Sequence, residues 1–131
     1  MANILIVDDD HIVRKVVRGI LAKAGHIVLL ANDGRQALEL LELQAIDLIV
    51  SDANMPGGVS GFNLVAMIRA NPSYKNIPII FLTSRKDKSD IIRAVQSGAN
   101  DYVIKPVRPD VFLKKVETSL QLLVKRKSNA G

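Results

Sequence analysis

The sequence has no cysteine and only two histidines, His11 and His26. The lack of cysteine excludes disulfide bonds and thiolate metal sites, and two histidines are too few for a multi-histidine metal centre. Aromatic residues make up 4% of the chain, whereas hydrophobic residues as a whole make up 48%. The core must therefore be built from Ile, Leu, Val and Ala, which is typical of a parallel sheet covered by helices.

Long apolar runs and a secretory leader are also missing. No hydrophobic run is long enough to cross a bilayer. The first residues, Met1-Ala2-Asn3, lack the charged region and the long apolar region of a signal peptide. We therefore expect a cytoplasmic protein that has no contact with a membrane.

The net charge of +5 has two interpretations: a partner rich in phosphate or carboxylate groups, or solvated helix faces. Several of the cations fall in the last quarter of the chain: Arg108, Lys114, Lys115, Lys125, Arg126 and Lys127. No aromatic side chain is interleaved with them at the end, as a surface that stacks on bases would require. Solvated helix faces are the favoured interpretation, so we do not expect this domain to bind nucleic acid directly.

Runs of apolar residues and helical repeats predict strands and helices in strict alternation, five of each. The predicted strands cover 4–7, 27–30, 48–52, 79–82 and 102–104. The predicted helices cover about 12–24, the segment after Asn32-Asp33-Gly34, 62–70, about 88–97, and the residues from Pro109 onward. Such alternation indicates an α/β fold in which parallel strands are joined by right-handed crossovers, with helices on both faces. We expect one domain over residues 1–126, followed at 127–131 by a polar, frayed tail that would serve as the start of a linker.

Local signals add three expectations about individual side chains. Asp10 and Asp33 directly precede predicted helices and are expected to act as N-caps. His11 and His26 are expected to lie at the surface. The helix at about 88–97 is expected to bury its apolar side chains Ile91, Ile92 and Val95.

Polar residues stand where the predicted strands end: Asp8 and Asp9, then Asp52, Thr83 and Lys105. In a parallel sheet all carboxyl ends open on one edge, so these residues are expected to converge. Several carboxylates in one cleft repel one another unless a cation joins them. Oxygen ligands without histidine or cysteine favour Mg²⁺ or a similar hard ion.

Carboxylates, a divalent cation, a lysine and a hydroxyl group together suit phosphoryl transfer. The lysine would neutralise an incoming anion, and the hydroxyl of Thr83 would donate a hydrogen bond to it. Asp52 is the best candidate for the attacking group, because its predicted strand is central and lies between the acidic pair and Lys105.

The chain resembles the receiver domains of two-component response regulators, and the single-domain chemotaxis regulator is the nearest form. The resemblance covers about residues 3–125 and is carried by segments 4–9, 51–56, 82–84 and 102–106, with the sequences ILIVDD, SDANMP, LTS and YVIKP. It implies a flavodoxin-like three-layer αβα sandwich whose five-stranded parallel sheet has the order 2-1-3-4-5.

The resemblance also implies a Mg²⁺-dependent reaction. Asp52 would accept a phosphoryl group from the phosphohistidine of a histidine kinase or a histidine phosphotransfer protein. Asp9, Asp52 and the backbone carbonyl of Asn54 would bind Mg²⁺, and Asp8 would assist through water. Lys105 would contact the phosphoryl oxygens. The protein would be a signalling switch whose own chemistry is limited to self-phosphorylation and self-dephosphorylation.

Further implications concern the switch. Thr83 would move toward the phosphoryl group, and Tyr102 would move inward with it. The Lys105–Pro106 peptide bond would be cis. The face formed by the fourth helix, fifth strand and fifth helix would report the state to a target protein or an output domain, or form a homodimer on phosphorylation.

The sequence departs from the family in the segment 56–61, which is one residue longer than the usual turn and alters the expected loop shape. Two other functions are open. A phosphohydrolase of the haloacid dehalogenase type would use Asp8 as its nucleophile, but would leave Asp52 without a role. A non-phosphorylated interaction module on the same fold would be expected to lack an acid or the lysine, and none is missing here.

Overall fold

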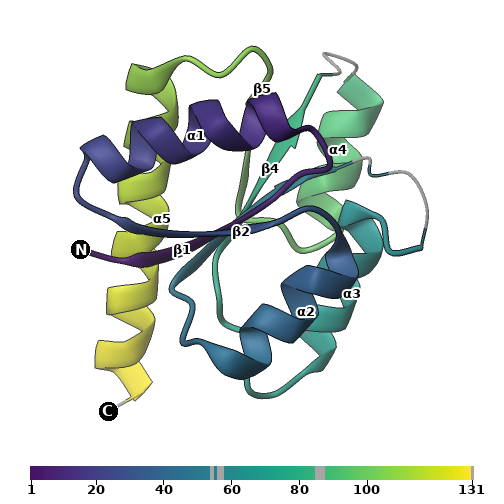
Figure 1. Cartoon of the computed structure of the whole chain (residues 1–131). Helices are drawn as coiled ribbons and strands as arrows, with labels where there is room; N and C mark the ends of the chain where they lie inside the picture. The colour runs from purple at the N-terminus through teal and green to yellow at the C-terminus, as the bar shows by residue number, and fades with distance from the viewer. Residues whose placement is uncertain (54, 56–57, 85–87, 131) are drawn as a thin grey trace.

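The computed structural model describes residues 1–53, 55, 58–84 and 88–130 (Figure 1). Its strands are β1 (Asn3–Val7), β2 (Ile27–Ala31), β3 (Leu48–Asp52), β4 (Ile79–Thr83) and β5 (Asp101–Ile104). Its helices are α1 (His11–Lys23), α2 (Gly34–Leu43), α3 (Gly61–Ala70), α4 (Lys88–Gln96) and α5 (Pro109–Ala130). The predicted alternation is confirmed, and the predicted ends differ from these by only a residue or two apart from the last helix.

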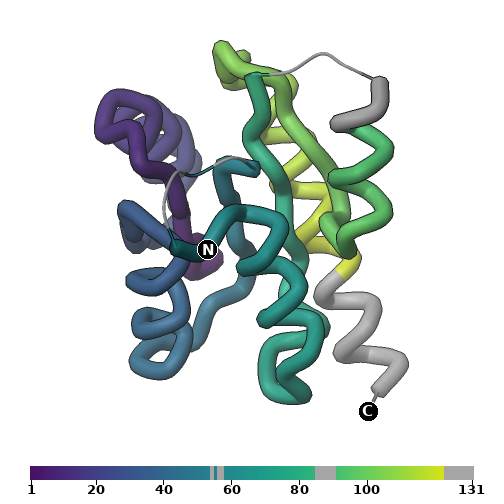
Figure 2. Tube along the Cα trace, turned by 90° about the vertical axis from the view of Figure 1, so that its right-hand side faces the viewer, coloured from purple at the N-terminus to yellow at the C-terminus, as the bar shows by residue number. Residues whose placement is uncertain are grey.

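The five strands form one parallel sheet in the order β2-β1-β3-β4-β5. The order reverses between β1 and β3, so crossovers leave β1 toward one edge and β3 toward the other. Figure 2 shows the result: α1 and α2 lie at one side of the molecule and α4 lies at the opposite side. Because α1 and α5 cover one face of this sheet and α2, α3 and α4 cover the other, the flavodoxin-like three-layer sandwich is confirmed. Within the described residues, no helix combines the length and hydrophobicity needed to span a membrane.

Each face of the sheet has its own apolar core. Leu5, Leu64 and Phe81 belong to the cluster under α2, α3 and α4. Ile4 and Phe112 belong to the cluster under α1 and α5. Consecutive residues of β1 serve opposite clusters, which explains why the buried strands are apolar at every position.

Two predicted helix caps are confirmed and a third was not predicted. The side chain of Asp10 accepts a hydrogen bond from the amide of Ile12 at 2.9 Å, and that of Asp33 accepts one from the amide of Gln36 at 2.8 Å. Ser60 caps α3 in the same way. The caps fix where α1, α2 and α3 begin, and therefore where the preceding loops end.

The expectation that α4 buries Ile92 and Val95 is wrong. Ile92 is 46% exposed and Val95 is 57% exposed, whereas the smaller Ala94 is buried. Because α4 packs beside the edge strand β5, only a narrow strip of it meets the sheet. Ala94 shares that strip with the partly buried Ile91.

Two other expectations also need correction. His11 is exposed as expected, but the side chain of His26 is only 7% exposed. Its Nδ1 accepts a hydrogen bond from the amide of Ala2, because β1 and β2 start side by side. The helix α5 continues to Ala130, so residues 127–130 are helical and not a frayed tail. The domain boundary at residue 126 stays a prediction.

Candidate phosphoacceptor site

The strand register brings the predicted site residues to one level. Val7 of β1 pairs with Ser51 of β3. The residues that follow them, Asp8 and Asp52, therefore lie beside each other at the carboxyl edge. Backbone bonds continue past the strand ends: the amide of Asp8 donates to Ala31 at 3.1 Å, and the amide of Lys105 donates to Thr83 at 2.8 Å. These bonds extend the hydrogen bonding of the sheet to the functional residues.

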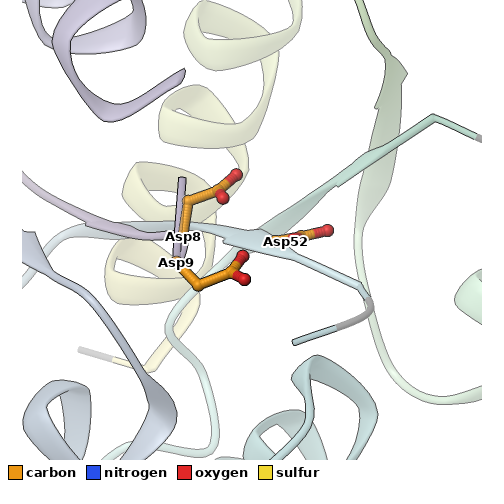
Figure 3. Close-up of side chains that lie close together, drawn as sticks. All are labelled: Asp8, Asp9 and Asp52. Atoms are coloured by element: carbon orange, nitrogen blue, oxygen red, sulfur yellow. The ribbon is translucent and has the colours of Figure 1, made fainter. Parts of the chain in front are cut away.

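Three carboxylates converge at this edge. Asp8, Asp9 and Asp52 each offer an oxygen within 4.8 Å of the others, and Figure 3 shows their carboxylates directed to the same side of the strand ends. Asp8 is fully buried and Asp52 is 8% exposed, while Asp9 is exposed. Water therefore screens Asp9 well and Asp8 poorly, so the negative charge of the group needs a counter-charge.

Lys105 supplies part of that counter-charge. Its Nζ lies 3.1 Å from Asp8 Oδ2 and 3.7 Å from Asp52 Oδ2. The other oxygen of Asp8 accepts a hydrogen bond from the amide of Asp10 at 2.9 Å. The peptide bond from Lys105 to Pro106 is cis, as expected.

The residues fit a hard divalent cation. Among the described residues, Asp8 Oδ2 has no hydrogen-bond partner, and its contact with Lys105 is an ion pair of 3.1 Å. A buried carboxylate oxygen with an unused lone pair, close to two other carboxylates, is a donor set that suits Mg²⁺. The expected further ligand, Asn54, lies outside the described residues.

The structure also places the two expected switch residues. Thr83 is buried at the end of β4, and Tyr102 is partly buried on β5. Tyr102 pairs with Phe81, and Thr83 pairs with Ile104. Because side chains alternate along a strand, Thr83 and Tyr102 share one face of the sheet as diagonal neighbours on adjacent strands.

Two supporting residues were not predicted. A Cβ atom on Gly61 would lie 2.1 Å from the backbone oxygen of Asp52, so only glycine lets α3 start this close to the strand end that carries Asp52. Arg14 donates a hydrogen bond to the backbone oxygen of Asp8. The sequence hints at the first of these only through a glycine directly after the N-cap, and it has no signal for the second.

The acidic cluster lies at the ends of β1 and β3, where the strand order reverses and open α/β sheets bind their ligands. A parallel sheet of this order, with acids and a lysine at its carboxyl edge, defines the flavodoxin-like signalling domains of two-component systems. The chain belongs to this family, because the model of the response regulator receiver domain matches residues 4–117.

Individual relatives agree with this assignment. A chemotaxis protein CheY homologue of Campylobacter jejuni is 35% identical over 120 residues, which is 90% of this chain and 92% of that protein. The crystal structure of a response regulator from Chloroflexus aurantiacus has a TM-score of 0.88 at 34% identity, covering 92% of this chain and 98% of that chain.

A third relative is informative about the site. The receiver domain of a sensor histidine kinase from Pseudomonas aeruginosa has a magnesium ion coordinated in its active-site cleft. It is 30% identical, with a TM-score of 0.83 and coverage of 92% of this chain and 98% of that one. The comparisons thus support a signalling receiver domain, and they lend no support to a phosphohydrolase of the haloacid dehalogenase type.

Proposed function

We propose that Asp52 accepts a phosphoryl group from a phosphohistidine in a reaction that depends on Mg²⁺. The observation that carries this proposal is the convergence of the largely buried Asp52 with Asp8, Asp9 and Lys105 at one strand edge. In the transfer, the P–N bond of the donor breaks as a carboxylate oxygen of Asp52 forms a bond to phosphorus, and the donor imidazole leaves. Hydrolysis of the acyl phosphate returns the free carboxylate.

The chain's own residues prepare Asp52 for this reaction. An anionic nucleophile repels an anionic donor, and the ammonium of Lys105, 3.7 Å from Asp52, offsets this repulsion. Because the contact between Lys105 and Asp52 is largely shielded from water, the attraction between the two charges is stronger than it would be at the surface. The hydroxyl of Thr83 would donate a hydrogen bond to a phosphoryl oxygen. The lack of a side chain on Gly61 lets the start of α3 lie against the backbone of Asp52.

Asp8, Asp9 and Asp52 would hold the Mg²⁺ ion, together with the backbone carbonyl of Asn54. When bound, the ion supplies positive charge that screens the carboxylate from the donor and stabilises the transferred group. The magnesium-containing receiver domain of the Pseudomonas aeruginosa kinase supports this choice of metal.

The donor would be a histidine kinase or a histidine phosphotransfer protein. A hollow of about 200 Å³ adjoins the site and is lined in part by Ile12, Val16, Lys105 and Pro106. Ile12 and Val16 are exposed apolar residues of α1. This surface beside the nucleophile offers the donor a place to dock. We propose that the phosphoryl transfer takes place in the cytoplasm.

The readout would use the face formed by α4, β5 and α5. Thr83 would move toward the phosphoryl group and Tyr102 would follow inward. The exposed Ile92 and Val95 of α4 would then contribute apolar area to a contact with a target protein, an output domain or a second copy of the chain.

Mass spectrometry tests the proposal directly. With acetyl phosphate and Mg²⁺, the protein should gain the mass of one phosphoryl group, and neither Asp52→Asn nor the wild type in EDTA should gain it. Asp47→Asn is the matched control, because Asp47 lies at the opposite end of β3 and the change should leave phosphorylation intact. A phosphoryl group on Asp52→Asn would refute the assignment, and a turnover of phosphoesters that is lost in Asp8→Asn would favour the phosphohydrolase mechanism.

A further inference from the structure

Lys115 of α5 reaches across the outer edge of the sheet to the residue proposed as the switch. Its Nζ donates a hydrogen bond to the backbone oxygen of Tyr102 and lies 3.1 Å from Asp101 Oδ1. The same ammonium lies 4.6 Å from the centroid of the Tyr102 ring. One cation thus contacts the backbone and the ring of Tyr102 as well as the neighbouring carboxylate.

The edge position of β5 explains the first two contacts. β5 is the last strand of the sheet, so the amide and the carbonyl of Tyr102 on its outer side have no neighbouring strand to pair with. Asp101 Oδ1 accepts a hydrogen bond from the Tyr102 amide at 2.8 Å, and Lys115 donates to the carbonyl. The ion pair between Asp101 and Lys115 joins these two hydrogen bonds. We call the three contacts together the clamp, and they fix the position of the ammonium.

The fixed ammonium restrains the ring. A lysine cation attracts the face of an aromatic ring within about 6 Å of the centroid. Because Lys115 is tied to Asp101 and to the Tyr102 carbonyl, it cannot follow the ring to another staggered rotamer. A change of the Tyr102 rotamer therefore breaks the cation–π contact, while the contacts of the clamp, which do not involve the ring, stay intact.

We propose that Lys115 is a positioning residue that holds the Tyr102 ring in the pose seen here and so sets how readily the ring moves inward. The inference rests on the proposed switch role of Tyr102. A cation–π contact at a partly exposed site stabilises one ring pose over another by about two- to fivefold in population. Removing the ammonium should shift the ring toward the activated pose by that factor.

Fluorine NMR can follow this one ring. The chain has two tyrosines, Tyr74 and Tyr102, so protein labelled with 3-fluorotyrosine gives two signals that Tyr74→Phe assigns. Beryllofluoride with Mg²⁺ serves as the phosphoryl mimic and defines the activated position of the Tyr102 signal. Lys115→Met removes the ammonium and keeps the stem, and Lys115→Arg restores a cation. Lys114→Met is the matched control, because Lys114 is an exposed neighbour on α5.

Without the mimic, the Tyr102 signal of Lys115→Met should move toward the activated position, while Lys115→Arg and Lys114→Met stay near the wild type. The beryllofluoride concentration at half-shift should fall by about two- to fivefold. The inference is overturned if Lys115→Met keeps the wild-type signal and midpoint, or if Lys114→Met moves both as far. A wild-type Tyr102 signal that ignores the mimic, combined with a shifted signal in Lys115→Met, would uphold the positioning role and refute the switch role.

Discussion

At the amino end of the strands, polar side chains form hydrogen bonds mostly with backbone groups, whereas at the carboxyl end three carboxylates lie close to one another. Asp47 accepts a hydrogen bond from the amide of Asn3 at 2.8 Å, and Asn3 donates from its side chain to Ala45 at 3.0 Å. Arg69 lies at the same end and binds the residues that precede β4 and β5. It donates to backbone oxygens of Gly98, Lys75 and Ile77 and to Asn100 Oδ1.

The carboxyl end has the opposite arrangement. The described residues leave Asp8 Oδ2 buried without a hydrogen-bond partner and place it close to two further carboxylates. One exception weakens the contrast, because His26 Nε2 at the amino end also lacks a hydrogen-bond partner among these residues; it lies 3.8 Å from Glu117.

The difference separates stability from function within one sheet. Polar groups that satisfy each other hold the fold and have no capacity left for a ligand. Carboxylates that repel one another cost stability, and this cost is relieved when a cation is bound. Substitutions at the amino end should therefore lower the free energy of unfolding and leave phosphorylation intact. Substitutions at the carboxyl end should instead impair phosphorylation or metal binding.

The largest effect is expected at the carboxyl end from Lys105→Met. Loss of the ammonium beside Asp52 should lower the rate of phosphorylation by acetyl phosphate about 10²–10³-fold, as for the loss of one preorganised electrostatic contact. Time-resolved mass spectrometry measures this rate. Lys75→Met, an exposed lysine at the amino end, is the control and should leave the rate unchanged. A similar loss in both variants would remove the distinction between the two ends.

The next effect is expected at the amino end from Arg69→Ala. The change leaves several backbone oxygens and Asn100 without their donor, so the free energy of unfolding should fall by about 2–3 kcal/mol. Urea denaturation measures the fall, and Arg18→Ala on the exposed face of α1 should change it by less than about 0.5 kcal/mol. The phosphorylation rate of the folded Arg69→Ala protein should match the wild type, and a parallel loss of rate would mean that Arg69 serves the site.

The smallest effect compares one acid from each end. Asp47→Ala should lower the free energy of unfolding by about 1 kcal/mol, because it removes the partner of the Asn3 amide. Asp9→Ala should cost no stability in EDTA, since it relieves repulsion, but should weaken Mg²⁺ binding by at least about 10-fold, the lower end of the loss seen when only an outer-shell partner is removed. Urea denaturation and calorimetric titration with Mg²⁺ check the pair. Equal destabilisation by both changes would contradict the comparison.

Much of the site could be predicted because it depends on strand ends. A strand of apolar residues that stops at Asp52 or Lys105 is visible in the sequence, and parallel topology brings such ends together whatever the loops do. The caps Asp10 and Asp33 were predictable for a similar reason, because a cap acts on amides two or three residues away.

Other features depend on partners that are distant in the sequence. Ile92 and Val95 have helical spacing that suits a buried face, yet the position of α4 beside an edge strand leaves them exposed. His26 looks like a surface residue until Ala2 and Glu117 are placed around it. Gly61 gains its meaning only from the backbone of Asp52.

The sequence by itself determined the alternation of strands and helices, the caps that were predicted and the acids and lysine at the strand ends, because these follow from side-chain periodicity and local hydrogen bonding. Only the tertiary structure decided how close the carboxylates lie, which face of α4 is exposed, and that Lys115 clamps Tyr102. Those properties arise from packing between elements far apart in the chain, and local pattern does not encode the angles and distances at which such elements meet.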